Sequence, residues 1–261
     1  MTPETLLRHL DEATLWPTGC GLDVPAAYER ALSVRQLRSR RGEQPRGYKV
    51  GFTNRAIWPR YGVYAPIWGT VWNTTLSFCE DEGQLALAGT CQPRLEPECV
   101  FGLRATPPAQ ASLAGLLASI EWVAPGFEVV QSHRADWKFN AADTIADGAL
   151  HARLLVGRRV PVGELPADAT AFEAQLAAAH VTLARNGEAV DAGTGANVLD
   201  GPLHALAHFL AALRDCPGAP DLQAGDVVTT GTWTDAWPVQ RGEHWRADFQ
   251  GPLAPLAVRF T

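Results

Sequence analysis

The chain has 261 residues, 46% hydrophobic and 19% charged, which is typical of a globular protein with one or two buried cores. The formal net charge of −6 lacks the basic excess of nucleic-acid binders, so we expect no nucleic-acid partner. No apolar run reaches the roughly 18 residues that a membrane-spanning helix needs, and the charged first residues do not resemble a signal peptide.

The five cysteines and the basic residues give few further signals. The cysteine count is odd and no CxxC spacing occurs, which argues against a disulfide framework and against a zinc site. We therefore expect a protein of the reducing cytoplasm. The one basic run, residues 35–41 (RQLRSRR), is typical of a solvated helix end, with an anion or subunit contact as the alternative.

The first part of the chain predicts two helices followed by extended segments. A cap signature at Thr2 and apolar residues at helical spacing predict a helix over 3–14. A second helix is predicted from Pro25 to about residue 40. Residues 48–53 alternate like a strand, and 62–78 are extended but broken by proline and glycine.

The rest of the chain predicts strands separated by a few helices. Residues 111–122 have helical spacing, and Pro125 with Gly126 is expected to end that helix. Asn186-Gly187 is a strong turn signal, so residues 174–192 are predicted to form a hairpin. A last helix is predicted over 201–214, and further strands over 95–103, 127–131, 225–231 and 253–261. Because no regular alternation of strand and helix is present, we predict an α+β fold on a curled sheet or sandwich.

Two glutamates flank a proline in the segment Glu96-Pro97-Glu98. In a strand, residues two apart point to the same face, so both carboxylates should project together. Like charges at that distance repel, and a positive group is expected between them. Pro97 cannot donate a ladder hydrogen bond, which places this strand at a sheet edge or at a bulge.

Glu128 is a third acid, inside the otherwise apolar strand FEVVQ. A carboxylate in such a strand needs a partner. Three oxygen donors without nearby histidine or cysteine suit Mg²⁺ or Mn²⁺ better than Zn²⁺. The alternative is that Glu96 and Glu98 lie on a solvated edge while Glu128 pairs with an arginine.

Several segments resemble the fumarylacetoacetate hydrolase superfamily, in its branch of 2-keto-4-pentenoate hydratases and 4-oxalocrotonate decarboxylases. The similarity runs over roughly residues 25–261. It is carried by GYKVGFTN at 47–54, PIWG at 66–69, LEPECVFGL at 95–103, FEVVQSHRADWKF at 127–139 with AADTIADG at 141–148, and AGDVVTTGTWT at 224–234.

The resemblance implies a mixed β-sandwich roll with N-terminal helices, in which Glu96, Glu98 and Glu128 hold Mg²⁺ or Mn²⁺ and Lys49 reaches the substrate. We expect a single domain, 1–261, whose helical segment 1–45 packs on a catalytic β-roll core, 46–261. We also expect a homo-oligomer.

The implied reaction is that of a lyase of aromatic catabolism acting on a small 2-oxo acid. We expect hydration of a 2-hydroxy-2,4-dienoate to a 4-hydroxy-2-oxo acid. Decarboxylation of a 2-oxo-3-enedioate, C–C hydrolysis of an acylpyruvate and a non-catalytic partner role are the alternatives. The chain departs from the branch after Ala146-Asp147, where the branch's Asn and Ser are missing, so it looks like a divergent subgroup.

Three side chains are candidates for catalysis. Lys49 could contact the substrate carboxylate or enolate or donate a proton; alternatively, it is a strand lysine with an exposed tip. Asp147 could orient Lys49 or a water, or stabilise a turn. His151 could be a general acid or base near neutral pH, or a packed, hydrogen-bonded histidine.

Four residues are candidates for substrate binding. The resemblance gives Thr230, Gly231 and Thr232 a backbone and hydroxyl contact to substrate, with a turn at a strand end as the alternative. Trp68 could wall the cleft or belong to the core.

Overall fold

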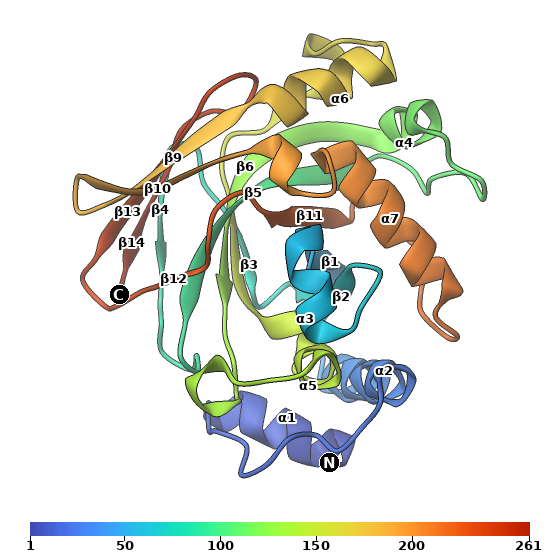
Figure 1. The fold of residues 1–261 in the computed structure, drawn as a ribbon, viewed down its shortest axis with the longest axis vertical. Helices are drawn as coiled ribbons and strands as arrows, with labels where there is room; N and C mark the ends of the chain where they lie inside the picture. The colour runs from blue at the N-terminus through green and yellow to red at the C-terminus, as the bar shows by residue number, and fades with distance from the viewer.

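Two mixed β-sheets form the framework of the computed structural model, which describes residues 1–261 (Figure 1). The larger sheet has nine strands, seven of them in the order β2-β1-β11-β5-β6-β7-β3, with β12 paired to β5 and β8 paired to β6. The smaller sheet has the order β10-β9-β13-β14-β4. Strands and helices do not alternate regularly, so the predicted α+β class is confirmed.

The strands of the larger sheet are β1 (Pro45–Gly51), β2 (Ile67–Trp72), β3 (Leu76–Phe78), β5 (Arg94–Leu103), β6 (Ile120–Val130), β7 (His151–Val156), β8 (Val160–Pro161), β11 (Val227–Thr232) and β12 (Trp237–Pro238). Those of the smaller sheet are β4 (Glu82–Leu85), β9 (His180–Arg185), β10 (Glu188–Thr194), β13 (His244–Phe249) and β14 (Leu256–Phe260).

The helices are α1 (Pro3–Glu12), α2 (Val24–Arg40), α3 (Trp58–Tyr61), α4 (Leu113–Ser119), α5 (Ala141–Ala146), α6 (Ala169–Ala178) and α7 (Pro202–Asp215). Side-chain caps explain where several begin. The Thr2 side chain accepts the Thr5 N–H at the start of α1, as predicted, and Asp23 accepts the Ala26 N–H at the start of α2. No helix is long and apolar enough to cross a membrane.

The N-terminal helices lie at one end of the molecule, beside α5 (Figure 1). A small apolar cluster joins them to the rest of the fold. It contains Leu6, Trp16 and Ala27 from the N-terminal segment, packed with residues such as Ile67 and Ile145 from β2 and α5. Burial of these side chains stabilises the N-terminal segment on the larger sheet.

The larger sheet is apolar on both faces. Alternate residues of β5, Leu95, Cys99 and Phe101, belong to the main core, whereas Val100 belongs to a separate cluster with Ala124 and other residues. Because side chains alternate along a strand, Glu96 and Glu98 share the face of Val100. The carboxylates thus lie on the side opposite the main core.

Two predicted boundaries were wrong. Helix α4 ends at Ser119, and β6 starts at Ile120 and continues through Pro125. Around Pro125 the neighbour of β6 changes, because Val123 pairs with β8 whereas Gly126 pairs with β7. A residue without an N–H is tolerated at such a gap. Residues 174–178 belong to α6, so only β9 and β10 form the hairpin, with the predicted turn at 186–187.

Candidate metal centre

Three carboxylates converge between β5 and β6. Glu96 lies opposite Glu128 in the antiparallel register, and Glu98 follows two residues along β5. One carboxylate oxygen from each residue lies within 4.8 Å of the others. Glu98 and Glu128 are fully buried, whereas the Glu96 side chain is 15% exposed. The predicted convergence of the three acids is therefore present.

Strand β5 is not at a sheet edge, which corrects one of the two positions expected from Pro97. It lies between β11 and β6. The other expected feature, an irregularity, is present on the neighbouring strand, where the β11–β5 register shifts between Thr229 and Thr232. Pro97 lies between the end of the β5–β11 pairing at Glu98 and the start of the β5–β12 pairing at Leu95. Its carbonyl accepts the Trp233 N–H, and its missing N–H is tolerated at this change of neighbour.

Glu98 is held by the backbone of β11. Its Oε2 atom accepts the Gly231 N–H at 2.6 Å, and its Oε1 atom has no hydrogen-bond partner. Burial, together with the Glu128 charge, raises the pKa of Glu98 well above its ordinary value. Gly231 has a φ of +101°, and a Cβ there would lie 1.8 Å from Thr53 Oγ1. Only glycine fits this approach.

Lys49 lies beside the acids on β1. Its side chain is 4% exposed, and its Nζ atom lies 3.0 Å from Glu128 Oε2 and 3.6 Å from Glu96 Oε2. Burial alone would lower the pKa of Lys49, but the nearby carboxylates outweigh it and raise this pKa. Lys49 is therefore a buried ammonium group, not a lysine with an exposed tip.

His151 lies behind Glu128. Its Nδ1 atom is 2.8 Å from Glu128 Oε1, and its Nε2 atom is 2.8 Å from Thr75 Oγ1. Burial, with the positive charges of Lys49 and two arginines, lowers the pKa of His151 well below its ordinary value. The neutral ring then donates from Nδ1 to Glu128 and accepts the Thr75 hydroxyl at Nε2. This arrangement orients one metal-ligand candidate.

The donor set fits a hard divalent cation. The fully buried Glu98 Oε1 atom has no hydrogen-bond partner, and such a group is costly when left unpaired. Glu128 Oε2 has only the Lys49 ammonium beside it, at 3.0 Å. Three carboxylates face the single positive charge of Lys49, so the cluster is short of positive charge. All three candidate ligands are oxygen donors, which Mg²⁺ and Mn²⁺ prefer.

A cavity of about 450 Å³ opens beside the acids. Lys49, Glu96, Gly231 and Thr232 line it, so the structure brings together four of the residues predicted for the site. Such a volume suits a small organic ligand.

One wall of this cavity is aromatic and was not predicted. Phe52 stacks on Tyr61 with ring centroids 4.7 Å apart, and Tyr61 stacks on Phe139 at 5.8 Å. Arg60 also lines the cavity and has no ion-pair partner. Residues 55–61 carry neither strand alternation nor a motif, so the sequence held no signal for them.

Asp147 is not beside Lys49, which corrects its expected orienting role. Its carboxylate accepts the His133 backbone N–H at 2.9 Å and lies 2.6 Å from His133 Nδ1. His133 is fully buried and stacks on Trp16. Asp147 therefore fixes the segment after β6 and does not orient Lys49.

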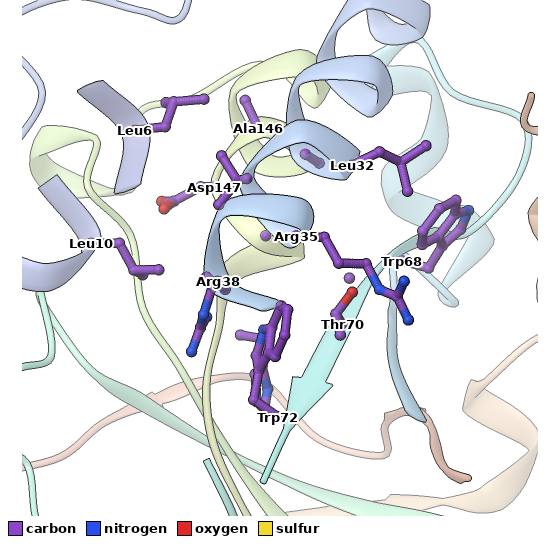
Figure 2. Close-up of a pocket in the computed structure, with 15 residues that line it drawn as sticks. Leu6, Leu10, Leu32, Arg35, Arg38, Trp68, Thr70, Trp72, Ala146 and Asp147 are labelled. Atoms are coloured by element: carbon purple, nitrogen blue, oxygen red, sulfur yellow. The ribbon is translucent and has the colours of Figure 1, made fainter. Parts of the chain in front are cut away.

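Trp68 and Thr230 also lie outside the cavity. Trp68 neighbours Val50 in the β1–β2 register, stacks on Tyr28 and belongs to the main core, on the face opposite Lys49. It borders a different, small pocket beneath α1 and α2 (Figure 2). Thr230 is fully buried and its hydroxyl donates to the Cys99 carbonyl at 2.8 Å. Both side chains therefore belong to the packed interior and do not line the cavity beside the acids.

The fold and the acidic cluster define a class of protein. Residues 88–259 match the model of the fumarylacetoacetate (FAA) hydrolase C-terminal family. The chain belongs to this family.

The similar proteins within the family are named as two kinds of enzyme. The chain is 30% identical to the 2-hydroxyhexa-2,4-dienoate hydratase of Comamonas testosteroni, over 92% of this chain and 87% of that one. It is 31% identical to a 4-oxalocrotonate decarboxylase of a Pseudomonas species, over 98% and 97%. The 4-oxalocrotonate decarboxylase of Pseudomonas putida G7, solved with magnesium and adipate, superposes with a TM-score of 0.85 at 26% identity, over 99% of this chain and 95% of that chain.

Proposed function

We propose that this protein is a divalent-cation-dependent hydro-lyase that adds water to a small 2-hydroxy-2,4-dienoate and yields a 4-hydroxy-2-oxo acid. The observation that supports the proposal most is the set of three converging carboxylates beside a cavity. Glu96, Glu98 and Glu128 would hold Mg²⁺ or Mn²⁺. When bound, the cation would stabilise negative charge on the substrate's 2-oxygen.

The chain's own groups have distinct roles in this proposal. The Lys49 ammonium at the base of the cavity binds the substrate carboxylate and keeps its proton at Nζ, because the neighbouring acids raise its pKa. His151 holds Glu128 by its Nδ1–H. The Thr232 hydroxyl and the Gly231 backbone border the substrate. The stacked rings of Phe52 and Tyr61 give the cavity an apolar wall against which the diene packs.

A second candidate function is decarboxylation of a 2-oxo-3-enedioate. Arg60 favours it, because this cation lines the same cavity as Lys49 and has no carboxylate partner in the chain. A substrate with a carboxylate at each end could engage both cations. The similarity to decarboxylases over almost the full chain also supports it.

The test is product analysis with the purified protein and Mn²⁺. A 2-hydroxy-2,4-dienoate should lose its dienol absorbance and give one hydrated product, whereas a 2-oxo-3-enedioate would release CO₂ if the second candidate holds. Glu98→Gln should abolish turnover, and Glu121→Gln, on the exposed side of β6, should retain it. Undiminished turnover after metal removal would contradict the proposal. Cleavage of an acylpyruvate into two acids would indicate a hydrolase. Absence of turnover with every substrate would indicate a non-catalytic partner.

We also propose that the protein is a homo-oligomer. Tyr64 is 85% exposed at a mostly apolar groove of about 520 Å³ between α2 and α7, and exposed apolar patches often mark interfaces. Light scattering should give a multiple of the 28.1 kDa chain mass, and Tyr64→Ser should weaken the assembly.

We propose that the protein works in a reducing compartment such as the cytoplasm, because of its free thiols. All five cysteines are free, and long-lived free thiols are typical of reducing compartments. Cell fractionation would test this location.

A further inference from the structure

A second cavity, of about 250 Å³, lies on the far side of His151 from the acidic cluster. Three arginines, Arg38, Arg41 and Arg153, line it, and Asp11 is the only carboxylate that does. Thr74, Thr75 and Gln131 add polar side chains to the wall. The cavity wall thus carries more positive than negative side chains, whereas the chain as a whole has a net charge of −6.

The existing ion pairs do not balance these arginines. Arg38 pairs with Glu43 at 2.6 Å, and Arg41 pairs with both Glu43 and Asp11. Three guanidinium groups thus face two carboxylates. The excess charge is that of Arg153, which donates only to the carbonyls of Ala152 and Ala88. Burial and the Arg38 charge lower the pKa of Arg153, the sign of an uncompensated cation.

Each arginine retains a nitrogen without a protein acceptor. These are Nη1 of Arg38, Nη2 of Arg41 and Nε of Arg153. Arg38 is fixed over the Trp72 ring, with its guanidinium carbon 4.4 Å from the ring centroid, and the two side chains lie together in Figure 2. A guanidinium held in place loses less entropy when it binds an anion.

We propose that this cavity is a binding site for a small oxyanion of the phosphate type. A singly charged oxyanion such as dihydrogen phosphate would neutralise the excess charge of one and accept hydrogen bonds from all three arginines. The cavity volume lies below the roughly 300 Å³ at which pockets for drug-sized ligands begin, so the occupant is small. The site also gives the basic run at 35–41 a role, since Arg38 and Arg41 belong to it.

The site adjoins the metal centre but does not depend on its chemistry. Thr75 and His151 line the cavity, and His151 in turn contacts Glu128. An occupant therefore lies one side chain away from a metal-ligand candidate. The inference goes beyond the proposed function, and it would stand if the catalysed reaction proved different.

Isothermal titration of the metal-free protein with inorganic phosphate tests the site. We expect one phosphate per chain, with affinity that falls as NaCl rises. Arg153→Gln and Arg41→Gln should each weaken binding at least tenfold, and Arg158→Gln, a surface arginine outside the cavity, should not. A parallel titration with glycerol 3-phosphate shows whether a free phosphate or a phosphate ester is preferred. Circular dichroism checks that each variant is folded.

Absence of phosphate binding, or binding that neither Arg153→Gln nor Arg41→Gln weakens, would overturn the proposal. Light scattering tests the competing explanation, that the arginines form a subunit contact. If wild-type protein binds no phosphate and Arg153→Gln breaks an oligomer, the arginines serve a subunit contact and the oxyanion site is wrong.

Discussion

Glu96 and Glu128 lie directly opposite each other across the β5–β6 ladder. Like charges at such a cross-strand position destabilise a sheet. The Lys49 ammonium lies within 4 Å of both carboxylates, but Glu98 adds a third negative charge. The centre of the larger sheet is thus stable only if protons or a cation offset this charge.

The first prediction concerns the ligands. Mn²⁺ should raise the melting temperature of the wild-type protein, because a ligand at 100 times its Kd stabilises the folded state by about 2.7 kcal/mol. Glu98→Gln should lose this shift, whereas Glu121→Gln should keep it. In the absence of metal, Glu98→Gln should be at least as stable as wild type, because it removes a buried charge. An unchanged Mn²⁺ shift in Glu98→Gln would exclude it as a ligand.

The second prediction is a pH dependence. Burial, partly offset by Lys49, raises the pKa of Glu128 from 4.5 to about 7. Between these values the folded protein binds more protons than the unfolded chain, so metal-free stability should fall as pH rises from 4.5 to about 7. Mn²⁺ affinity should rise over the same range, because the cation competes with the proton. Glu128→Gln should make this fall in stability smaller, leaving the part that comes from the raised pKa of Glu98, as measured by urea unfolding at several pH values.

The third prediction separates two roles for His151. If it positions Glu128, His151→Gln should weaken Mn²⁺ binding by about 10- to 100-fold. His180→Gln, on an exposed part of β9, is the control. A variant with normal Mn²⁺ affinity but an altered pH profile of kcat would instead indicate a general acid or base in contact with substrate.

The fourth prediction concerns Lys49. Lys49→Met should raise KM if the ammonium binds the substrate carboxylate, and should lower kcat by roughly 100-fold or more if it transfers a proton. Lys49→Arg should restore KM in the first case only. Steady-state kinetics on the preferred substrate distinguishes carboxylate binding from proton transfer. An unchanged kcat/KM would show that Lys49 does not act on the substrate.

The fifth prediction tests the close approach at Gly231. Gly231→Ala should lower the free energy of unfolding by roughly 3 kcal/mol, since it adds a clash with Thr53 to an unfavourable φ. Gly242→Ala has a φ of +89° and no atom within 4 Å of the new Cβ. It should cost only about 1 kcal/mol. Equal losses in the two variants would show that the clash relaxes.

Local patterns in the sequence were enough to predict part of the site. The two-residue spacing of Glu96 and Glu98 set their common face, and the apolar neighbours of Glu128 indicated a buried strand. That these strands pair with Glu96 opposite Glu128 is a long-range register that the spacing could not give. The resemblance implied only that the three acids hold one cation.

The failures have the same origin. Trp68 and Lys49 are close in sequence and both lie on strands, but the β1–β2 register turns Trp68 to the opposite face. Pro125 does not end a helix. It lies within β6, at the point where the neighbouring strand changes from β8 to β7 and a missing N–H is tolerated. Arg153 carries no motif at all, and its unbalanced charge becomes visible only when β7 meets the end of α2.

The proposed site crosses five adjacent strands, because Lys49, Gly231, Glu98, Glu128 and His151 come from β1, β11, β5, β6 and β7, which are consecutive in the larger sheet. Amide protons in these strands should exchange only through global unfolding. Connections between strands complete the rest of the cavity, among them the β1–β2 connection, which carries Tyr61. The strands that carry the proposed site and the connections that complete its cavity are thus different stretches of chain.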